Sequence, residues 1–265
     1  MTAGALIFAF NNEQTDYVSM ARWCAKNIHR HLGISTAIVT DQSFETKAHE
    51  RLVHCNSVGN NGRYFADYGT NVTWHNESRT DAYSLSPWDR TLVLDSDYVV
   101  ASDQLKVLLK IEQDFVVHRW AYDVTGQNNF DGLNYFGEHR MPMWWATVMM
   151  FRRSTQAQLI FDCMNMIKRN WDHYKHLYKS NTSMYRNDHA LSIALGIVNG
   201  HTMNHPRIPW PLASLTPEHN LSQISTDRYR VDYITADNKK RWIELEQDFH
   251  AMGKRHLGEI IANSC

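Results

Sequence analysis

The stretch that decides the fold lies at residues 89–100 and reads Asp-Arg-Thr-Leu-Val-Leu-Asp-Ser-Asp-Tyr-Val-Val. Its Thr91–Leu94 part is an unbroken apolar run that follows a turn-forming Ser-Pro pair at 86–87, which is typical of a strand buried on both faces. Asp95 and Asp97 come where this strand should end. In open α/β sheets, ligands bind beyond the carboxyl ends of the strands. The sequence therefore predicts an α/β protein with a ligand site at these two acids.

Two neighbouring carboxylates at the end of a buried strand repel each other and lose hydration, and a divalent cation compensates for this most directly. Residues i and i+2 of an extended chain point to the same side, so both Asp95 and Asp97 are expected to face one ion. The alternative interpretation is a strand end followed by an Asx turn that binds no metal.

The composition is that of an ordinary globular enzyme. The chain has 265 residues, of which 43% are hydrophobic and 21% charged, and this suffices for one large α/β domain or two small ones. The net charge of -1 gives no general attraction for nucleic acid or anionic membrane, so such binding would need a local basic patch. Four scattered cysteines and the lack of a leader or membrane-length apolar stretch favour a cytoplasmic protein with no membrane contact.

The order of the remaining elements supports a mostly parallel sheet. An apolar run at 5–10, a helical pattern over 16–32 that Gly33 ends, and a second apolar run at 37–40 predict a β-α-β unit. Other elements are expected as follows: a short helix from 78 that ends before Pro87, a helical segment through 109, strands at 115–117 and 141–151, and helices over 155–171 and from 186. No internal repeat or linker is evident, so we expect a single domain.

The Leu-Asp-Ser-Asp segment at 94–97 resembles the D-x-D motif of nucleotide-sugar glycosyltransferases with the GT-A fold, in particular the glycogenin-like (family 8) group. The resemblance implies a single GT-A (Rossmann-like) domain over residues 1–265, with a mostly parallel mixed sheet flanked by helices. Residues 1–100 would be the nucleotide-binding half and residues 101–265 the acceptor-binding half. The implied activity is metal-dependent transfer of a hexosyl or pentosyl group from a nucleotide diphosphate sugar, a UDP-sugar, to a hydroxyl acceptor.

A second motif lies near the carboxyl terminus. His250, Gly253 and Lys254 resemble the His-x-x-Gly-x-x-Lys of the glycogenin-like family, although the lysine comes two positions early. The resemblance implies that His250 is a metal ligand beside Asp95 and Asp97, that Lys254 holds the diphosphate and that Gly253 lies at the substrate. A site with two carboxylates and an imidazole suits Mn²⁺, and Mg²⁺ is the alternative ion.

The resemblance also assigns nucleotide-binding positions in the first half of the chain: Asn11, Asn12, Tyr17, Arg79, Asp95 and Ser96. The two asparagines and Tyr17 match the loop and tyrosine that hold base and ribose in that family. Arg79 matches an arginine on the helix before the D-x-D strand, and a guanidinium suits phosphate geometry. A surface arginine is the alternative for Arg79, and helix capping explains the nearby Asp16 equally well.

Four residues of the second half are predicted to contact sugar or acceptor. The run at 141–151 resembles the family's Phe-Asn-Ala-Gly-Val-Met segment, with Trp145 in place of the asparagine. Trp144 and Trp145 should point opposite ways on a strand, so that one stacks on a sugar or base and the other packs in the core. Asn187 and Asp188 open a helix that resembles the acidic Asp-Gln-Asp helix start facing the transferred sugar.

Asp188 is therefore the candidate catalytic group beside the anomeric carbon, together with Asp97, and helix capping is the alternative for Asp188.

Other function classes stay open. A nucleotidyltransferase of sugar phosphates uses the same kind of Asp-x-Asp edge, but it usually has a Gly-rich phosphate loop where this chain has Asn-Asn-Glu-Gln. A non-catalytic carbohydrate-binding protein would keep aromatic platforms without a metal.

The acceptor stays open among a glycan, a protein and a hydroxymethylated base in phage DNA, the last because small transferases of this kind also resemble phage enzymes that decorate modified DNA. Basic clusters that suit contact with DNA phosphates lie at 168–169 with Lys175 and Lys179, and at 239–241, with a solvated surface as the alternative.

Overall fold

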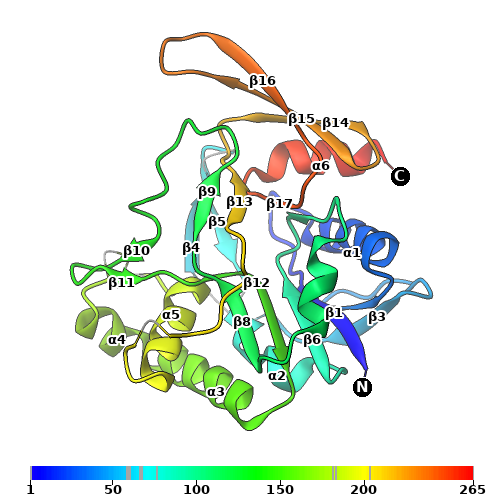
Figure 1. Cartoon of the computed structure of the whole chain (residues 1–265). Coiled ribbons are helices and arrows are strands. Elements are labelled where there is room, and N and C mark those ends of the chain that lie inside the picture. The colour runs from blue at the N-terminus through cyan, green and yellow to red at the C-terminus, as the bar shows by residue number, and fades with distance from the viewer. Residues whose placement is uncertain are drawn as a thin grey trace.

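The computed structural model describes residues 2–57, 61–65, 68–75, 77–180, 182, 184–202 and 204–264. Its centre is a six-stranded sheet with the order β3-β2-β1-β6-β12-β8 (Figure 1). The strands are β1 (Ala3–Phe8), β2 (Ser35–Thr40), β3 (Glu50–His54), β6 (Arg90–Leu94), β8 (Phe115–His118) and β12 (Trp145–Arg152). The first four strands of this order run parallel, and β12 runs antiparallel to both of its neighbours. The predicted α/β class with a mostly parallel mixed sheet is confirmed.

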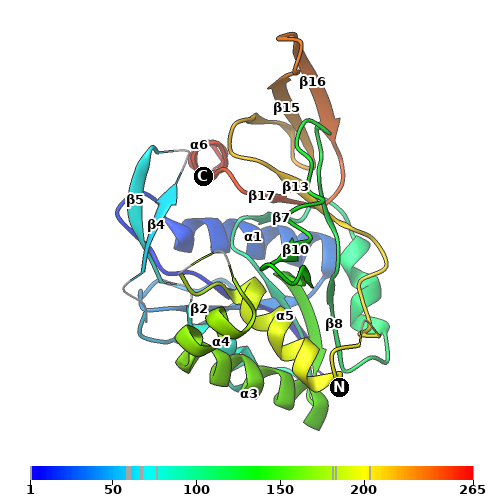
Figure 2. The same ribbon diagram turned by 90° about the vertical axis from the view of Figure 1, so that its left-hand side faces the viewer.

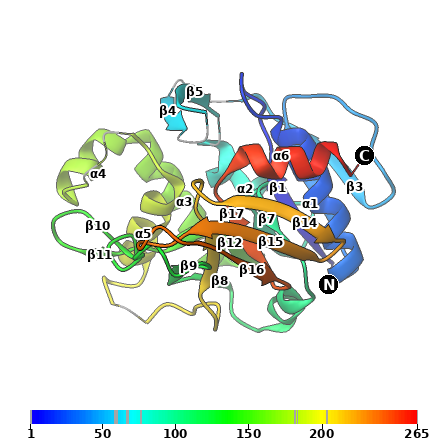
Figure 3. The ribbon, with the colours of Figure 1, turned by 90° about the horizontal axis from the view of Figure 1, so that it is seen from above.

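Helices flank this sheet. α1 (Tyr17–Leu32) packs against β1 and β2, α5 (Asn187–Val198) packs against β12, and α3 (Thr155–Arg169) packs against α5. Figure 3 shows α3 and the short α4 (Trp171–Leu177) on one side of the molecule and α1 on the other. The helix expected over 155–171 ends before Trp171, where α4 begins.

Shorter helical segments differ from the expected type. A 3-10 helix, η1 (Glu77–Asp81), and α2 (Ala82–Leu85) precede β6, and the segment expected to be helical through 109 is a 3-10 helix, η2 (Gln104–Lys110). The chain therefore approaches β6 through two single turns, which direct Arg79 towards the end of that strand.

A second sheet joins the middle of the chain to its carboxyl end. Its order is β7-β17-β13-β9, formed by β7 (Tyr98–Val99), β17 (Phe249–Ala251), β13 (Leu212–Leu215) and β9 (Ala121–Asp123). Tyr98 lies opposite His250, and the amide of Ala251 donates to the carbonyl of Asp97 at 3.0 Å. This pairing brings β17 beside the Asp-x-Asp segment.

The carboxyl-terminal part forms a cap over α1. The strands β14 (Asn220–Ser225), β15 (Arg228–Ile234) and β16 (Lys240–Leu245) form an antiparallel meander, and α6 (Lys254–Ala262) packs against β14 and α1. β15 and β16 project from the rest of the molecule (Figure 2). Buried residues of this region form a second hydrophobic cluster beside the main core of the six-stranded sheet.

Two hairpins complete the fold, β4 (Asn61–Phe65) with β5 (Thr70–Trp74), and β10 (Tyr135–Phe136) with β11 (Met141–Pro142). Within the described ranges, we find no helix that combines the length and apolar character needed to cross a membrane. A single domain with functional halves on either side of residue 100 stays a prediction.

Candidate active site

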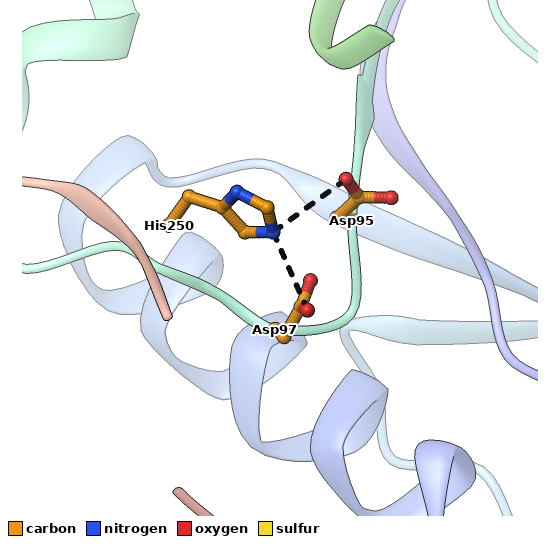
Figure 4. Close-up of side chains that lie close together, drawn as sticks. All are labelled: Asp95, Asp97 and His250. Carbon is orange, nitrogen blue, oxygen red and sulfur yellow. Dashed lines mark ion pairs between the residues drawn. The ribbon is translucent and has the colours of Figure 1, made fainter. Parts of the chain in front are cut away.

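Asp95, Asp97 and His250 converge at the carboxyl end of β6. Their possible ligand atoms all lie within 4.8 Å of one another. His250 Nε2 lies 3.4 Å from Asp97 Oδ2 and 4.0 Å from Asp95 Oδ2, and Figure 4 shows the imidazole facing both carboxylates from a separate strand. The sequence places these residues together correctly although His250 is far from the acids in the chain.

The prediction that an extended chain brings the two carboxylates to the same side is wrong. Asp95 and Asp97 do not lie on an extended chain, because the amide of Tyr98 donates to the carbonyl of Asp95 at 3.1 Å and closes a tight turn. The turn directs both carboxylates towards β17, and the pairing of Tyr98 with His250 then delivers the imidazole.

Cationic side chains compensate for the two carboxylates. Lys254 forms an ion pair with Asp97 and donates to the carbonyl of Met252 at 3.0 Å. Burial alone would raise the pKa of Asp97, but the charges of Lys254 and His250 outweigh it and hold this pKa well below its usual range. Asp97 is therefore ionised at neutral pH.

The donor set fits a divalent metal ion. Asp95 and Asp97 supply hard carboxylate oxygens and His250 supplies an imidazole nitrogen, a mixed set that Mn²⁺ accepts and that Mg²⁺ accepts in part. Asp97 is only 5% exposed, so an ion bound there would be shielded from bulk water on one side.

Arg79 lies in the interior next to Asp95 and contacts the metal-site residues from the side of the core. The side chain is 2% exposed, pairs with Asp95, and donates to the carbonyls of Ala146 at 2.9 Å and of Leu94 at 3.3 Å. These contacts hold the end of β6 against the start of β12. The predicted contact with phosphate stays untested, and the surface-arginine alternative is wrong because the side chain is buried.

A cavity of about 320 Å³ opens beside these residues. Ten of the residues predicted from the sequence line it: Tyr17, Arg79, Asp95, Ser96, Asp97, Trp145, Asn187, Asp188, His250 and Lys254. The cavity thus joins the acids at the end of β6 to the start of α5, as expected for a site beyond the carboxyl ends of parallel strands.

Four predicted residues are not part of this lining: Asn11, Asn12, Trp144 and Gly253. Asn11 Oδ1 accepts from the amide of Val18 at the start of α1, and Asn12 Oδ1 accepts from the amides of Gln14 and Thr15. Gly253 is the residue before α6. Their predicted contacts with nucleotide and substrate stay predictions, while the structure gives the two asparagines a local role. The side chain of Asp16 caps α1 by accepting from the amide of Ser19, so the helix-capping interpretation of Asp16 is confirmed.

The side chains of the neighbouring residues Trp144 and Trp145 point in opposite directions, as predicted. Trp145 lines the cavity, and its Nε1 donates to Asn134 Oδ1 at 3.2 Å. Trp144 packs in the core, edge-on to His205 at 5.3 Å between ring centroids. Trp145 is therefore the one of the two rings that faces the cavity.

Asp188 is held from two sides. Its Oδ1 accepts from the amide of Ala146 at 2.8 Å, and its Oδ2 pairs with Arg186 at 3.3 Å. Burial alone would raise the pKa of Asp188, but the Arg186 charge and the Ala146 amide lower it overall. The carboxylate is thus ionised and fixed at the cavity wall, and the N-cap position of α5 is taken by Arg186 rather than by Asp188.

Sequence reasoning missed Arg186 and an aromatic wall of the cavity. The wall comprises Phe8, Phe10, Tyr64, Phe65, Trp74 and Tyr185. Trp74 on β5 lies 6.3 Å from Tyr185 between ring centroids, so the β4–β5 hairpin meets the segment before α5 across the cavity. The aromatic content of the long loop over 56–78 was the signal in the sequence, but no periodicity there indicates which ring faces inwards.

Comparisons with known proteins identify only distant similarity. No family model and no curated protein matches the chain. It is similar to the glycosyltransferase GlyE of Streptococcus pneumoniae TIGR4, at 12% identity and a TM-score of 0.46, over 78% of this chain and 45% of GlyE. It is also similar to the galactosyltransferase LgtC, solved with donor and acceptor sugar analogs, at 12% identity and a TM-score of 0.46, over 72% of this chain and 70% of LgtC.

The bifunctional IspDF of Campylobacter jejuni is more distant still, at 9% identity and a TM-score of 0.39, over 80% of this chain and 50% of IspDF. The chain thus spans less than half the length of GlyE and half that of IspDF. The function is therefore argued from the site itself.

Proposed function

We propose that this chain is a metal-dependent glycosyltransferase that moves a sugar from a nucleotide diphosphate sugar, a UDP-sugar, to a hydroxyl acceptor. The observation that carries the proposal is the convergence of Asp95, Asp97 and His250 in one cavity with Lys254 beside them. A volume of about 320 Å³ lies within the range of small-molecule sites.

Asp95, Asp97 and His250 would hold Mn²⁺ or Mg²⁺. A bound divalent cation supplies positive charge to the diphosphate, whose negative charge grows as the glycosidic bond breaks. Lys254 adds a positive charge of the chain itself at the same carboxylate. Stabilisation of this kind is larger in the transition state than in the ground state, so it accelerates the chemical step.

The other walls position the donor. Tyr17 and the aromatic rings from β4 and β5 offer stacking surfaces for a base, and Trp145 offers one for a sugar. Asp188, ionised and fixed by Ala146 and Arg186, places a negative charge near the cavity wall, where it would favour positive charge on the anomeric carbon.

A thermal-shift panel of nucleotide diphosphates with and without Mn²⁺ tests the proposal. A ligand at about 100 times its Kd stabilises the folded state by about 2.7 kcal/mol. For a chain of this size we therefore expect the melting temperature to rise by about 5–10 °C. The rise should need nucleotide and metal together, and UDP should give the largest rise.

The matched variants are Asp97→Asn, which removes a buried ligand, and Asp103→Asn, which removes an exposed acid that makes no capping hydrogen bond. Asp97→Asn should lose the rise in melting temperature that needs UDP and Mn²⁺ together, and it should no longer release UDP from UDP-sugars. Asp103→Asn should keep both properties. A metal-independent response to sugars alone would indicate a carbohydrate-binding protein instead, and no response to any nucleotide would contradict the proposal.

A further inference from the structure

Arg119, the residue after β8, is a buried cation with no acid partner among the described residues. The side chain is 2% exposed, and its Nη1 donates to the carbonyls of Asn134 at 3.0 Å and Met143 at 3.3 Å. Its Nε and Nη2 are buried and have no hydrogen-bond partner in the described ranges. The guanidinium charge is met inside the chain by these carbonyls and by aromatic ring faces, rather than by an acid of the described ranges.

Aromatic rings and a second arginine surround it. Arg119 Cζ lies 3.9 Å from the ring centroid of Trp120 and 5.0 Å from that of Tyr135, and Arg140 Cζ lies 4.7 Å from the same Tyr135 ring. Trp120 is 40% exposed and Arg140 is exposed. We call Arg119, Trp120, Tyr135 and Arg140 the arginine–aromatic cluster.

A third arginine extends the positive charge. Arg207 is exposed, and its backbone bridges Val117 of β8, two residues before Arg119. Burial lowers the pKa of Arg119, and Tyr135 raises it in part. The positive charge of Arg207 also lowers this pKa, so the guanidinium groups of Arg119 and Arg207 lie close enough to repel each other. Among the described residues, no ion pair joins Arg119, Arg140 or Arg207 to an acid.

The basic residues that the sequence singled out behave differently. Lys168 lies 4.0 Å from Asp81, Lys175 pairs with Asp172, and Lys239 pairs with Asp237. Three of the seven basic residues in those two clusters thus have an acid partner, whereas no acid of the described ranges pairs with an arginine of the arginine–aromatic cluster.

The cluster is one residue away from the active-site cavity. The carbonyl of Asn134 accepts from Arg119, while Oδ1 of the same residue accepts from Nε1 of Trp145, which lines the cavity. Buried Asn134 therefore connects the wall of the cavity directly to the arginine–aromatic cluster, so the two sites are neighbours.

We infer that the exposed members of this cluster, Trp120 and Arg140, together with Arg207, bind a single strand of nucleic acid that serves as the acceptor, while the buried Arg119 supports the Trp120 ring from behind; this rests on the proposed glycosyltransferase function. Guanidinium groups neutralise phosphates, and exposed aromatic rings stack on bases, which is how single strands are bound without sequence preference. A cation behind a ring reduces the electron density that attracts the C–H groups of a sugar, so the exposed ring of Trp120, backed by Arg119, favours a flat base over a glycan.

The test is fluorescence anisotropy of a short labelled single-stranded DNA of mixed sequence against salt concentration. The double variant Arg140→Ala/Arg207→Ala should lower the slope of log affinity against log salt by about 1.4, since each single-strand phosphate contact contributes about 0.7. Trp120→Ala should weaken binding by about fivefold or more at every salt concentration, because it removes stacking. The matched control Lys240→Ala/Arg241→Ala on β16 removes two charges elsewhere and should leave both slope and affinity unchanged.

Three outcomes would overturn the inference: no binding by the wild type at low salt, equal losses in the cluster and control variants, or a sulfated glycan that competes as well for binding and depends on the same residues. The joint rise in melting temperature with UDP and Mn²⁺ is measured on the same variants. If that rise is present while DNA binding is absent, the acceptor assignment fails and the proposed activity stands. If the rise is absent in the wild type, the proposed activity itself fails.

Discussion

Arg79 and Asp188 bind the two backbone groups of the same residue, Ala146. Arg79 Nη1 donates to the Ala146 carbonyl at 2.9 Å, and the Ala146 amide donates to Asp188 Oδ1 at 2.8 Å. Because Arg79 also pairs with Asp95, a continuous polar chain links the candidate metal site to the start of α5. The start of β12 is the fixed point between the two halves of the cavity.

Replacement of Arg79 should therefore destabilise the fold as well as the site. In Arg79→Met, Asp95 loses its buried partner and two backbone carbonyls lose a donor, so we expect the free energy of unfolding to fall by about 3–5 kcal/mol. Urea unfolding measures this. Arg241→Met, which removes an exposed arginine of β16, should change it by less than about 0.5 kcal/mol. If Arg79→Met is as stable as the wild type but no longer binds nucleotide diphosphates, phosphate contact is its role instead.

The elements that the sequence predicts well are those with strong local patterns. The apolar runs of β1 and β6 and the helical spacing of α1, with Gly33 in the left-handed conformation that glycine favours at φ 71°, are visible without long-range information. Asp95 and Asp97 follow from the same logic, because they end a strand.

The third member of the site could not be placed by local pattern. His250 lies on β17, a strand of three residues whose position depends on pairing with the two-residue strand β7. Such short strands have no periodicity to recognise, so only the resemblance of a motif indicated His250. The buried Arg119 was missed for a related reason, since nothing in the sequence shows that a charged residue after a strand turns inwards.

Gly4 on β1 is predicted to be required by packing. A Cβ at this position would lie 2.2–2.6 Å from atoms of the Trp88 indole, which is buried. Gly4→Ala should therefore lower the free energy of unfolding by about 1–3 kcal/mol, because the indole must move within a dense core. Gly132→Ala is the matched control, since a Cβ there meets nothing within 4 Å. Equal thermal and urea stability of the two variants would contradict the packing argument.

His118 on β8 should make stability fall in mild acid. Burial lowers its pKa to about 4, although the Trp210 carbonyl, 3.0 Å from Nδ1, favours the charged form. Since the unfolded pKa is about 6.5, the unfolded state binds more protons between these values. The contribution of neutral His118 to the free energy of unfolding is therefore complete above about pH 6.5 and is lost as the pH falls towards 4.

Near pH 5 this linkage amounts to about 2 kcal/mol for one such histidine. His118→Asn keeps a donor near the Trp210 carbonyl but does not titrate, so its stability should depend less on pH than that of the wild type by about this amount. Urea unfolding at several pH values measures the difference. His139→Asn, which replaces an exposed histidine, should keep the wild-type profile, and a His118→Asn profile parallel to the wild type would show that His118 is not the group responsible.

Lys254 and a metal ion should compete for Asp97. The ammonium pairs with Asp97 and is held by the Met252 carbonyl at 3.0 Å, so it occupies an oxygen that the ion would use. Lys254→Met removes this competitor and a nearby like charge. Without nucleotide, the Kd for Mn²⁺ should therefore tighten, by about tenfold, or roughly 1.4 kcal/mol. With UDP present the effect on the Mn²⁺ Kd should reverse, because the diphosphate loses a cationic partner in the variant.

Calorimetric titration of Mn²⁺ with and without UDP measures both effects, with Lys106→Met on η2 as an exposed control. If Lys254→Met weakens Mn²⁺ binding in both conditions, the lysine supports the ion site rather than competing with it, and the assignment of Lys254 to the diphosphate loses its physical basis.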